Sequence, residues 1–116
     1  MRRKKMNVYD DANNLARAIK ESKEYLEYKQ EKEKVMADPS LKQKIEEFEK
    51  TRYEVQVLSI QGDQQNQEKI QKLQELYNVL VQNPVIKTYF DCEVRFNVML
   101  ADVNKIIAEA VKDVLQ

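Results

Sequence analysis

The sequence of 116 residues contains no histidine, and this absence removes much of enzyme chemistry. Histidine is the usual general base near neutral pH, the usual partner of a serine or cysteine nucleophile, and the commonest metal ligand. The single glycine excludes the glycine-rich loops that bind phosphates and dinucleotides. The single cysteine, Cys92, excludes an internal disulfide and a Cys/His zinc site within one chain. We therefore expect a protein that is not an enzyme, with no catalytic residues, cofactor-binding residues or metal ligands.

A long apolar run is also missing. No stretch approaches the roughly 20 apolar residues that a helix needs to cross a bilayer. The basic start of the chain, Arg2 to Lys5, is not followed by an apolar segment and so does not read as a signal peptide. Together with the lone cysteine, which suits a reducing compartment, these features predict a cytoplasmic protein that does not insert into membranes.

The residues that are abundant favour helix. Scarce glycine argues against tight hairpins, whereas plentiful Lys, Glu, Gln and Leu have high helix propensity. The length fits one domain. We expect an all-α fold, a helical bundle of about five helices with a long C-terminal helix. Residues 1–6 are expected to form a basic, disordered N-terminal tail, and residues 7–116 a single helical domain.

Three marks in the sequence predict where helices begin and end. Asp38-Pro39 and Asn83-Pro84 each read as an N-cap residue followed by proline at the first helical position. Gly62 suits the left-handed residue that follows a helix. The first helix is expected from about Val8 to Glu21, the third from Pro39 toward Gly62, and the last from Pro84 nearly to Gln116, with a polar linker at 63–67 before the fourth. Ser22 either caps a separate second helix or lies within a continuous one.

The last helix carries the clearest pattern in the sequence. Its apolar residues alternate spacings of three and four, which is a heptad seam interrupted only by Glu93. Val94, Met99, Ile106 and Val111 widen the stripe beyond a narrow seam, so it is expected to pack against more than one helix, within the chain or across a dimer. The candidate protein interface consists of Ile86, Tyr89, Phe96, Leu100, Val103 and Ile107.

Glu93 admits two interpretations. It is either a buried polar residue that pairs with an arginine, Arg52 or Arg95, or it lies where the stripe opens to solvent at a groove. Because burying an unpaired charge is costly, the second interpretation, in which Glu93 lies at a groove open to solvent, is favoured.

Other acidic residues and the cysteine are further candidates for chemistry. Glu46, Glu47 and Glu49 cluster on the third helix, and Asp91 and Glu93 on the fifth. Interleaved lysines at helical spacing favour a solvated charged face over a carboxylate-metal site. Two neighbouring acids raise rather than lower the pKa of a thiol, so Cys92 is expected to be an ordinary half-buried cysteine. A role as an iron–sulfur ligand is the less favoured alternative, because such clusters generally need four ligands.

Several of these features occur together in a known family. Met6-Asn7-Val8-Tyr9-Asp10-Asp11-Ala12, then Leu15 to Ser22 with Glu24-Tyr25, resembles the opening of the YlbF/YmcA/YheA family of bacterial regulators. Asp38-Pro39, Phe48, Asn83-Pro84 and Asn104-Lys105-Ile106-Ile107 resemble later landmarks of that family. The resemblance implies a helical bundle that forms homodimers or hetero-oligomers with related helical proteins. It also implies a role in competence, sporulation and biofilm development through control of RNA processing, and in some members an iron–sulfur cluster, for which this chain offers only Cys92.

Two functional hypotheses follow. The leading one is a regulatory subunit or adaptor that binds protein partners and meets nucleic acid only indirectly. The alternative is a nucleic-acid-binding protein that uses the tail from Arg2 to Lys5 and a stripe of Arg17, Lys20 and Lys23. The chain has 20 basic and 20 acidic residues, and four of the basic ones lie in the tail. The remainder is therefore mildly acidic, which disfavours binding to phosphate.

Overall fold

The computed structural model describes residues 7–62 and 66–115, and within these ranges the chain forms five helices and no strand. They are α1 (Val8–Glu21), α2 (Lys23–Ala37), α3 (Pro39–Gln61), α4 (Asn66–Leu80) and α5 (Pro84–Leu115). The predicted all-α fold with a long last helix is confirmed. The expected tail, residues 1–6, lies outside the described residues, as do Gln116 and residues 63–65 of the expected linker. The rest of that linker, Asn66 and Gln67, belongs to α4 instead.

Local capping chemistry sets the helix ends. Asp38 Oδ1 accepts hydrogen bonds from the Ser40 and Leu41 amides, at 3.0 and 3.2 Å, ahead of Pro39 at the start of α3. Asn83 Oδ1 accepts from the Val85 amide at 2.9 Å at the start of α5. These side chains satisfy amides that have no partner within the helix.

Residues 8–37 form two helices, α1 and α2, and not one continuous helix, because the helix breaks at Ser22. Ser22 has extended backbone, with φ −70° and ψ 150°, and its hydroxyl accepts from the Tyr25 amide at 3.1 Å. The same hydroxyl donates to the Ile19 carbonyl at 2.6 Å. One serine therefore ends α1 and caps α2, so the interpretation of two separate helices is confirmed.

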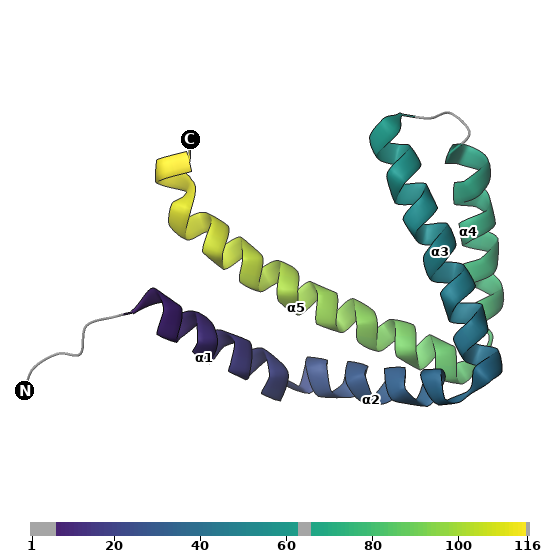
Figure 1. Ribbon diagram of the computed structural model, residues 1–116, viewed down its shortest axis with the longest axis horizontal. Helices are drawn as coiled ribbons and strands as arrows, with labels where there is room; N and C mark the ends of the chain where they lie inside the picture. The colour runs from purple at the N-terminus through teal and green to yellow at the C-terminus, as the bar shows by residue number, and fades with distance from the viewer. Residues whose placement is uncertain (1–6, 63–65, 116) are drawn as a thin grey trace, which may run out of the picture.

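The five helices form two arms that meet at a corner (Figure 1). The long arm consists of α1 and α2, which follow one another, with α5 running antiparallel beside α2. The hairpin arm consists of α3 and α4 packed side by side, and it projects from the end of the long arm. The chain measures 61 × 36 × 17 Å, and no described helix is long and apolar enough to span a membrane.

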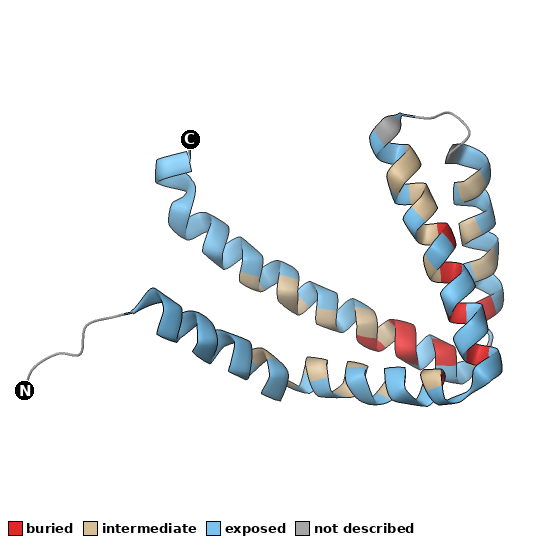
Figure 2. Ribbon diagram, viewed as in Figure 1, coloured by how far each residue is buried: buried red, intermediate tan, exposed pale blue. Residues whose placement is uncertain are grey.

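The hydrophobic core lies at the corner rather than along the arms (Figure 2). Ile45 and Ile86 are each 1% exposed, and the Phe48 and Phe90 rings pack at 5.2 Å between centroids. The core joins α2, α3, α4 and α5 through a set of buried residues: Val35, Leu41, Ile45, Phe48, Leu80, Ile86, Tyr89 and Phe90. None of the described residues at the far ends of the two arms belongs to it.

The chain is much more extended than a globular protein of its length. Its radius of gyration is 19.0 Å, whereas 116 compactly folded residues give about 13 Å. Its accessible surface is 9597 Å², whereas a folded monomer of 13.8 kDa exposes about 6,600 Å². The surplus exceeds what the ten residues outside the described ranges can supply, which is at most about 1,700 Å² at 1.45 Å² per dalton. The remainder indicates that the arms fold without a partner element along part of their length.

Candidate protein-interaction surface

The predicted interface residues of α5 divide into two groups. Ile86 and Tyr89 are buried at the corner, inside the chain's own core. Phe96 packs against α2, with its ring 5.3 Å from that of Tyr28. Leu100 and Val103 are half-buried, and Ile107 is 50% exposed. The first half of the predicted stripe therefore holds the fold together, and only the second half is free for a partner.

The free part of α5 exposes many more apolar side chains than that stripe alone. The sequence pattern indicated the widening by Val94 and Ile106, and it missed Val98, which is 54% exposed. We call the outer apolar residues of this helix the distal α5 face. It comprises Val94, Val98, Met99, Val103, Ile106, Ile107, Ala110, Val111 and Val114.

Part of the distal α5 face forms a shallow groove of about 410 Å³. Val94, Val98, Met99, Val103 and Ile106 supply its apolar lining, and Arg95, Asp102 and Glu24 of α2 border it. An apolar floor edged by charges suits a side-chain row from another helix better than a small polar ligand.

The apolar side of α1 is also exposed to solvent. None of its residues is buried, although Val8, Ala12, Leu15 and Ile19 share one side at helical spacing. We call these four residues the α1 face. What holds α1 as a helix is local, since the Asn7 side chain accepts from the Tyr9 amide at 2.9 Å and from the Asp10 amide at 3.2 Å. An amphipathic helix of this kind gains most of its stability by burying its apolar side.

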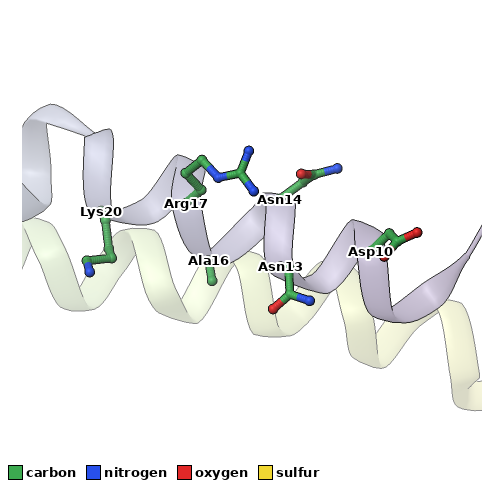
Figure 3. A pocket seen from close by; sticks show the side chains of 6 residues that line it. All are labelled: Asp10, Asn13, Asn14, Ala16, Arg17 and Lys20. Atoms are coloured by element: carbon green, nitrogen blue, oxygen red, sulfur yellow. The ribbon is translucent and has the colours of Figure 1, made fainter.

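A polar hollow of about 700 Å³ lies along α1, and Figure 3 shows the side chains around it. Among the described residues, those that line it all belong to that one helix: Asp10, Asn13, Asn14, Ala16, Arg17 and Lys20. Within residues 7–62 and 66–115 no second element lines the hollow, so the described part of the chain gives a ligand no enclosure there. Arg17 and Lys20 share it with Asp10, while Lys23, the third residue of the predicted basic stripe, lies 3.7 Å from Glu27. Acidic neighbours thus accompany the predicted basic stripe.

A polar cluster joins three helices on one side of the corner. Arg52 of α3 donates to Glu93 of α5 at 3.1 Å and also contacts Glu49 on its own helix. The Tyr28 hydroxyl of α2 donates to the other Glu93 oxygen at 3.2 Å. These residues, with Tyr53, Gln56 and Asn97, line an open hollow of about 430 Å³. Both interpretations of Glu93 are therefore partly confirmed, because the carboxylate pairs with Arg52 and also borders a groove.

Burial raises the pKa of Tyr28, and the nearby Tyr89 and Glu93 raise the pKa of this phenol further. Burial likewise raises the pKa of Tyr89, with Glu93 adding to the shift. Both tyrosines therefore stay protonated, and the Tyr28 hydroxyl acts as the hydrogen-bond donor to Glu93. The sequence could not predict that Tyr28 belongs to this cluster, because Tyr28 lies 65 residues before Glu93, to which it donates.

The other acidic residues that were candidates for a metal or acid/base site do not come together at one place. Glu46 pairs with Lys42 at 4.0 Å and Asp91 with Lys87 at 3.1 Å, each along its own helix. Within residues 7–62 and 66–115, no three acidic or cysteine side chains lie close enough to hold a metal ion.

Cys92 is more enclosed than the sequence suggested. It is buried rather than half-buried, because it faces the packed side of α5, and Arg95 donates to its sulfur at 3.3 Å. An iron–sulfur cluster generally needs four thiolate or imidazole ligands. One buried thiol in a chain without histidine does not fit that group.

Comparison with known proteins places the chain in a family. The family model described as control of competence regulator ComK, YlbF/YmcA, matches residues 8–112. A UPF0342 protein of Symbiobacterium thermophilum is 43% identical over 104 residues, covering 90% of this chain and 93% of the relative. One of Caldicellulosiruptor saccharolyticus is 42% identical over 105 residues, covering 90% and 88%. One of Bacillus cytotoxicus is 32% identical over 107 residues, covering 92% of each. The chain therefore belongs to the YlbF/YmcA/YheA family of bacterial proteins, which is linked to control of the competence regulator ComK.

Proposed function

We propose that this protein is a non-enzymatic regulatory subunit that docks a helical protein partner through the groove of the distal α5 face. The observation that carries the proposal is the exposure of large apolar side chains along α5 beyond the corner, with Ile106 at 69% the most open of the groove. Contiguous apolar surface on a water-exposed helix typically marks a binding site.

The chemistry of the groove supports a protein partner. Its walls are aliphatic, so the gain on binding comes from removing apolar surface from water, at about 25 cal/mol per Å². Arg95 and Asp102 at its border can align a partner by charge without supplying most of the affinity. A helix that presents side chains at positions i, i+3 and i+7 matches such a groove.

Membership in the family supports a regulatory role of this kind. The family is linked to control of the competence regulator ComK. We propose that the chain contributes as an adaptor in a complex that controls RNA processing, and that it meets RNA only through its partner. Acidic neighbours beside Arg17, Lys20 and Lys23 give direct binding to nucleic acid no specific support.

The test is affinity capture with matched variants. The tagged full chain, Ile106→Glu and Ala108→Glu are each used to capture proteins from a lysate of a bacterium that carries the gene. Ala108 is exposed and lies outside the groove, so its glutamate controls for added charge on the same helix. We expect one protein to be recovered with the wild type and with Ala108→Glu, and to be lost with Ile106→Glu.

Two results would contradict the proposal. Equal recovery by all three chains would show that the groove is not the docking surface. Direct RNA binding that weakens steeply between low and high salt would favour the nucleic-acid alternative.

A further inference from the structure

The polar hollow of about 430 Å³ between α2, α3 and α5 carries more negative than positive charge. We call it the corner hollow. Its lining holds two carboxylates, Glu49 and Glu93, and one guanidinium, that of Arg52. Both carboxylates contact this same guanidinium. The lining therefore has a net charge of −1, which the residues that form it do not neutralise.

Glu93 already has its hydrogen bonds within the chain. One of its oxygens accepts from Arg52 at 3.1 Å and the other from Tyr28 at 3.2 Å. The Arg52 guanidinium also lies 5.6 Å from the centre of the Phe48 ring, a cation–π contact that helps to hold it in place. The acceptor capacity that remains in the corner hollow is therefore that of Glu49.

Glu49 has one oxygen with a donor and one without. Its Oε2 contacts Arg52, whereas its Oε1 is buried and meets no hydrogen-bond donor among residues 7–62 and 66–115. A buried carboxylate oxygen without a donor is costly. The side chain as a whole is 37% exposed, so a rotation of its carboxylate turns this oxygen toward the corner hollow. A donor that enters the hollow would satisfy it.

The other lining groups suit a flat organic cation. Tyr53 is 68% exposed, which leaves much of its side chain open to an incoming group. A guanidinium is planar, stacks on aromatic rings and presents its N–H donors as a fork that matches a carboxylate. Gln56 and Asn97 add amide oxygens that accept further hydrogen bonds.

We propose that the corner hollow binds a guanidinium group, with Glu49 as its acceptor and Tyr53 as the ring on which it stacks. The group comes either from a free guanidinium compound or from an arginine side chain of another protein. This site is separate from the groove of the proposed function. Glu93 at the hollow and Asp102 at the groove are nine residues apart on α5, which is about two and a half turns. They therefore lie on opposite sides of that helix.

The test is a titration of the isotope-labelled full chain followed by nuclear magnetic resonance. The probes are ethylguanidinium chloride and three capped glycine peptides with one central residue, which is arginine, lysine or the uncharged analogue citrulline. Potassium chloride keeps the ionic strength constant. We expect the side-chain amide signals of Gln56 and Asn97 to shift with ethylguanidinium and with the arginine peptide. The Kd should be about 1 to 10 mM, because an open hollow encloses little of a small ligand.

Matched variants assign the binding to the two named side chains. Glu49→Gln should weaken it by about tenfold, because it removes the charge that strengthens the hydrogen bonds. Glu46→Gln is the control, since Glu46 is an exposed carboxylate on the same helix outside the hollow. Tyr53→Leu, which leaves every ion pair in place, should weaken binding by about threefold, and Tyr53→Phe should not change it. The spectra themselves report whether each variant is folded.

The peptides distinguish the class of ligand and its source. The lysine peptide should bind about threefold more weakly than the arginine peptide, and the citrulline peptide about tenfold more weakly. Tighter binding of the arginine peptide than of ethylguanidinium supports an arginine from a protein, and equal binding supports a free compound. Equal binding of the arginine and citrulline peptides, or binding that Glu49→Gln and Tyr53→Leu both leave unchanged, would overturn the proposal. So would amide signals that do not move.

Discussion

At the scale of single residues, the corner depends on Glu93 and its partners. The side chain of Glu93 is only 12% exposed, and it receives hydrogen bonds from Arg52 and Tyr28 on two other helices. These donors offset the free-energy cost of removing the carboxylate from water. The three residues therefore connect the long arm to the hairpin arm by charge and hydrogen bonding, alongside the apolar core.

Arg52→Met should destabilise the chain by about 2 kcal/mol, because it leaves Glu93 enclosed without its cation. Glu93→Gln should cost less, about 1 kcal/mol, since the amide still accepts from Tyr28. The double variant should lose less than the sum of the two. Urea unfolding measures each value, and Lys87→Met, which breaks the exposed pair with Asp91, is the control with an expected change under about 0.5 kcal/mol. Additive losses would mean that Arg52 and Glu93 do not interact in solution.

The raised pKa of Tyr28 predicts how stability depends on pH. An unfolded tyrosine ionises near pH 10, whereas the folded chain holds the Tyr28 proton to higher pH. The unfolded state therefore binds fewer protons in that range, and stability falls as the pH rises above about 10. Tyr28→Phe should flatten this fall while lowering stability at pH 8 through the lost hydrogen bond. Unfolding curves between pH 8 and pH 11 give the comparison, and an unchanged slope in Tyr28→Phe would contradict it.

At the scale of helices, boundaries follow from single residues. Gly62, which ends α3, has φ +71°, and a Cβ placed there would meet no atom within 4 Å. Glycine is therefore favoured at this position because of its left-handed backbone conformation, and not because a larger side chain would clash with neighbouring atoms.

Gly62→Ala should therefore cost about 1 kcal/mol, because a residue with a Cβ is strained in a left-handed conformation. Gly62→Asn should cost less, because asparagine tolerates this region better. The midpoint of urea unfolding reports both changes, and equal losses from the two substitutions would argue that backbone conformation is not the cause.

The helix positions could be predicted well from the sequence because capping is a local property. Asp38, Asn83 and Gly62 each act within a few residues, so the amino-acid order alone predicts them. How the helices pack is not local. The spacing on α5 predicts a single seam interrupted only by Glu93. In the fold, Ile86 and Tyr89 enter the core while Ile107 stays exposed, because the hairpin arm leaves α5 at the corner. Spacing marks which side of a helix is apolar, and only the fold shows what covers it.

At the scale of the whole molecule, apolar docking predicts a weak response to salt. Raising the salt concentration from about 0.1 to about 0.5 M screens exposed charges but leaves apolar burial in place. The affinity for the captured protein partner should therefore change less than about threefold over that range. Calorimetry with the purified partner measures this, whereas a loss of about tenfold or more would indicate that charge dominates.

The position of the core has a consequence for amide hydrogen exchange. Because the buried residues gather at the corner, opening a helix end there disrupts the core, whereas opening the outer turns of α1 or α5 disrupts almost none of it. Amides of the isolated chain should therefore exchange on a gradient, slowest near Ile45 and Ile86 and fastest toward Val8 and Val114. A bound partner or a second copy would slow exchange at the outer turns first. The places where protection rises would thus map the occupied surface residue by residue, whatever molecule occupies it.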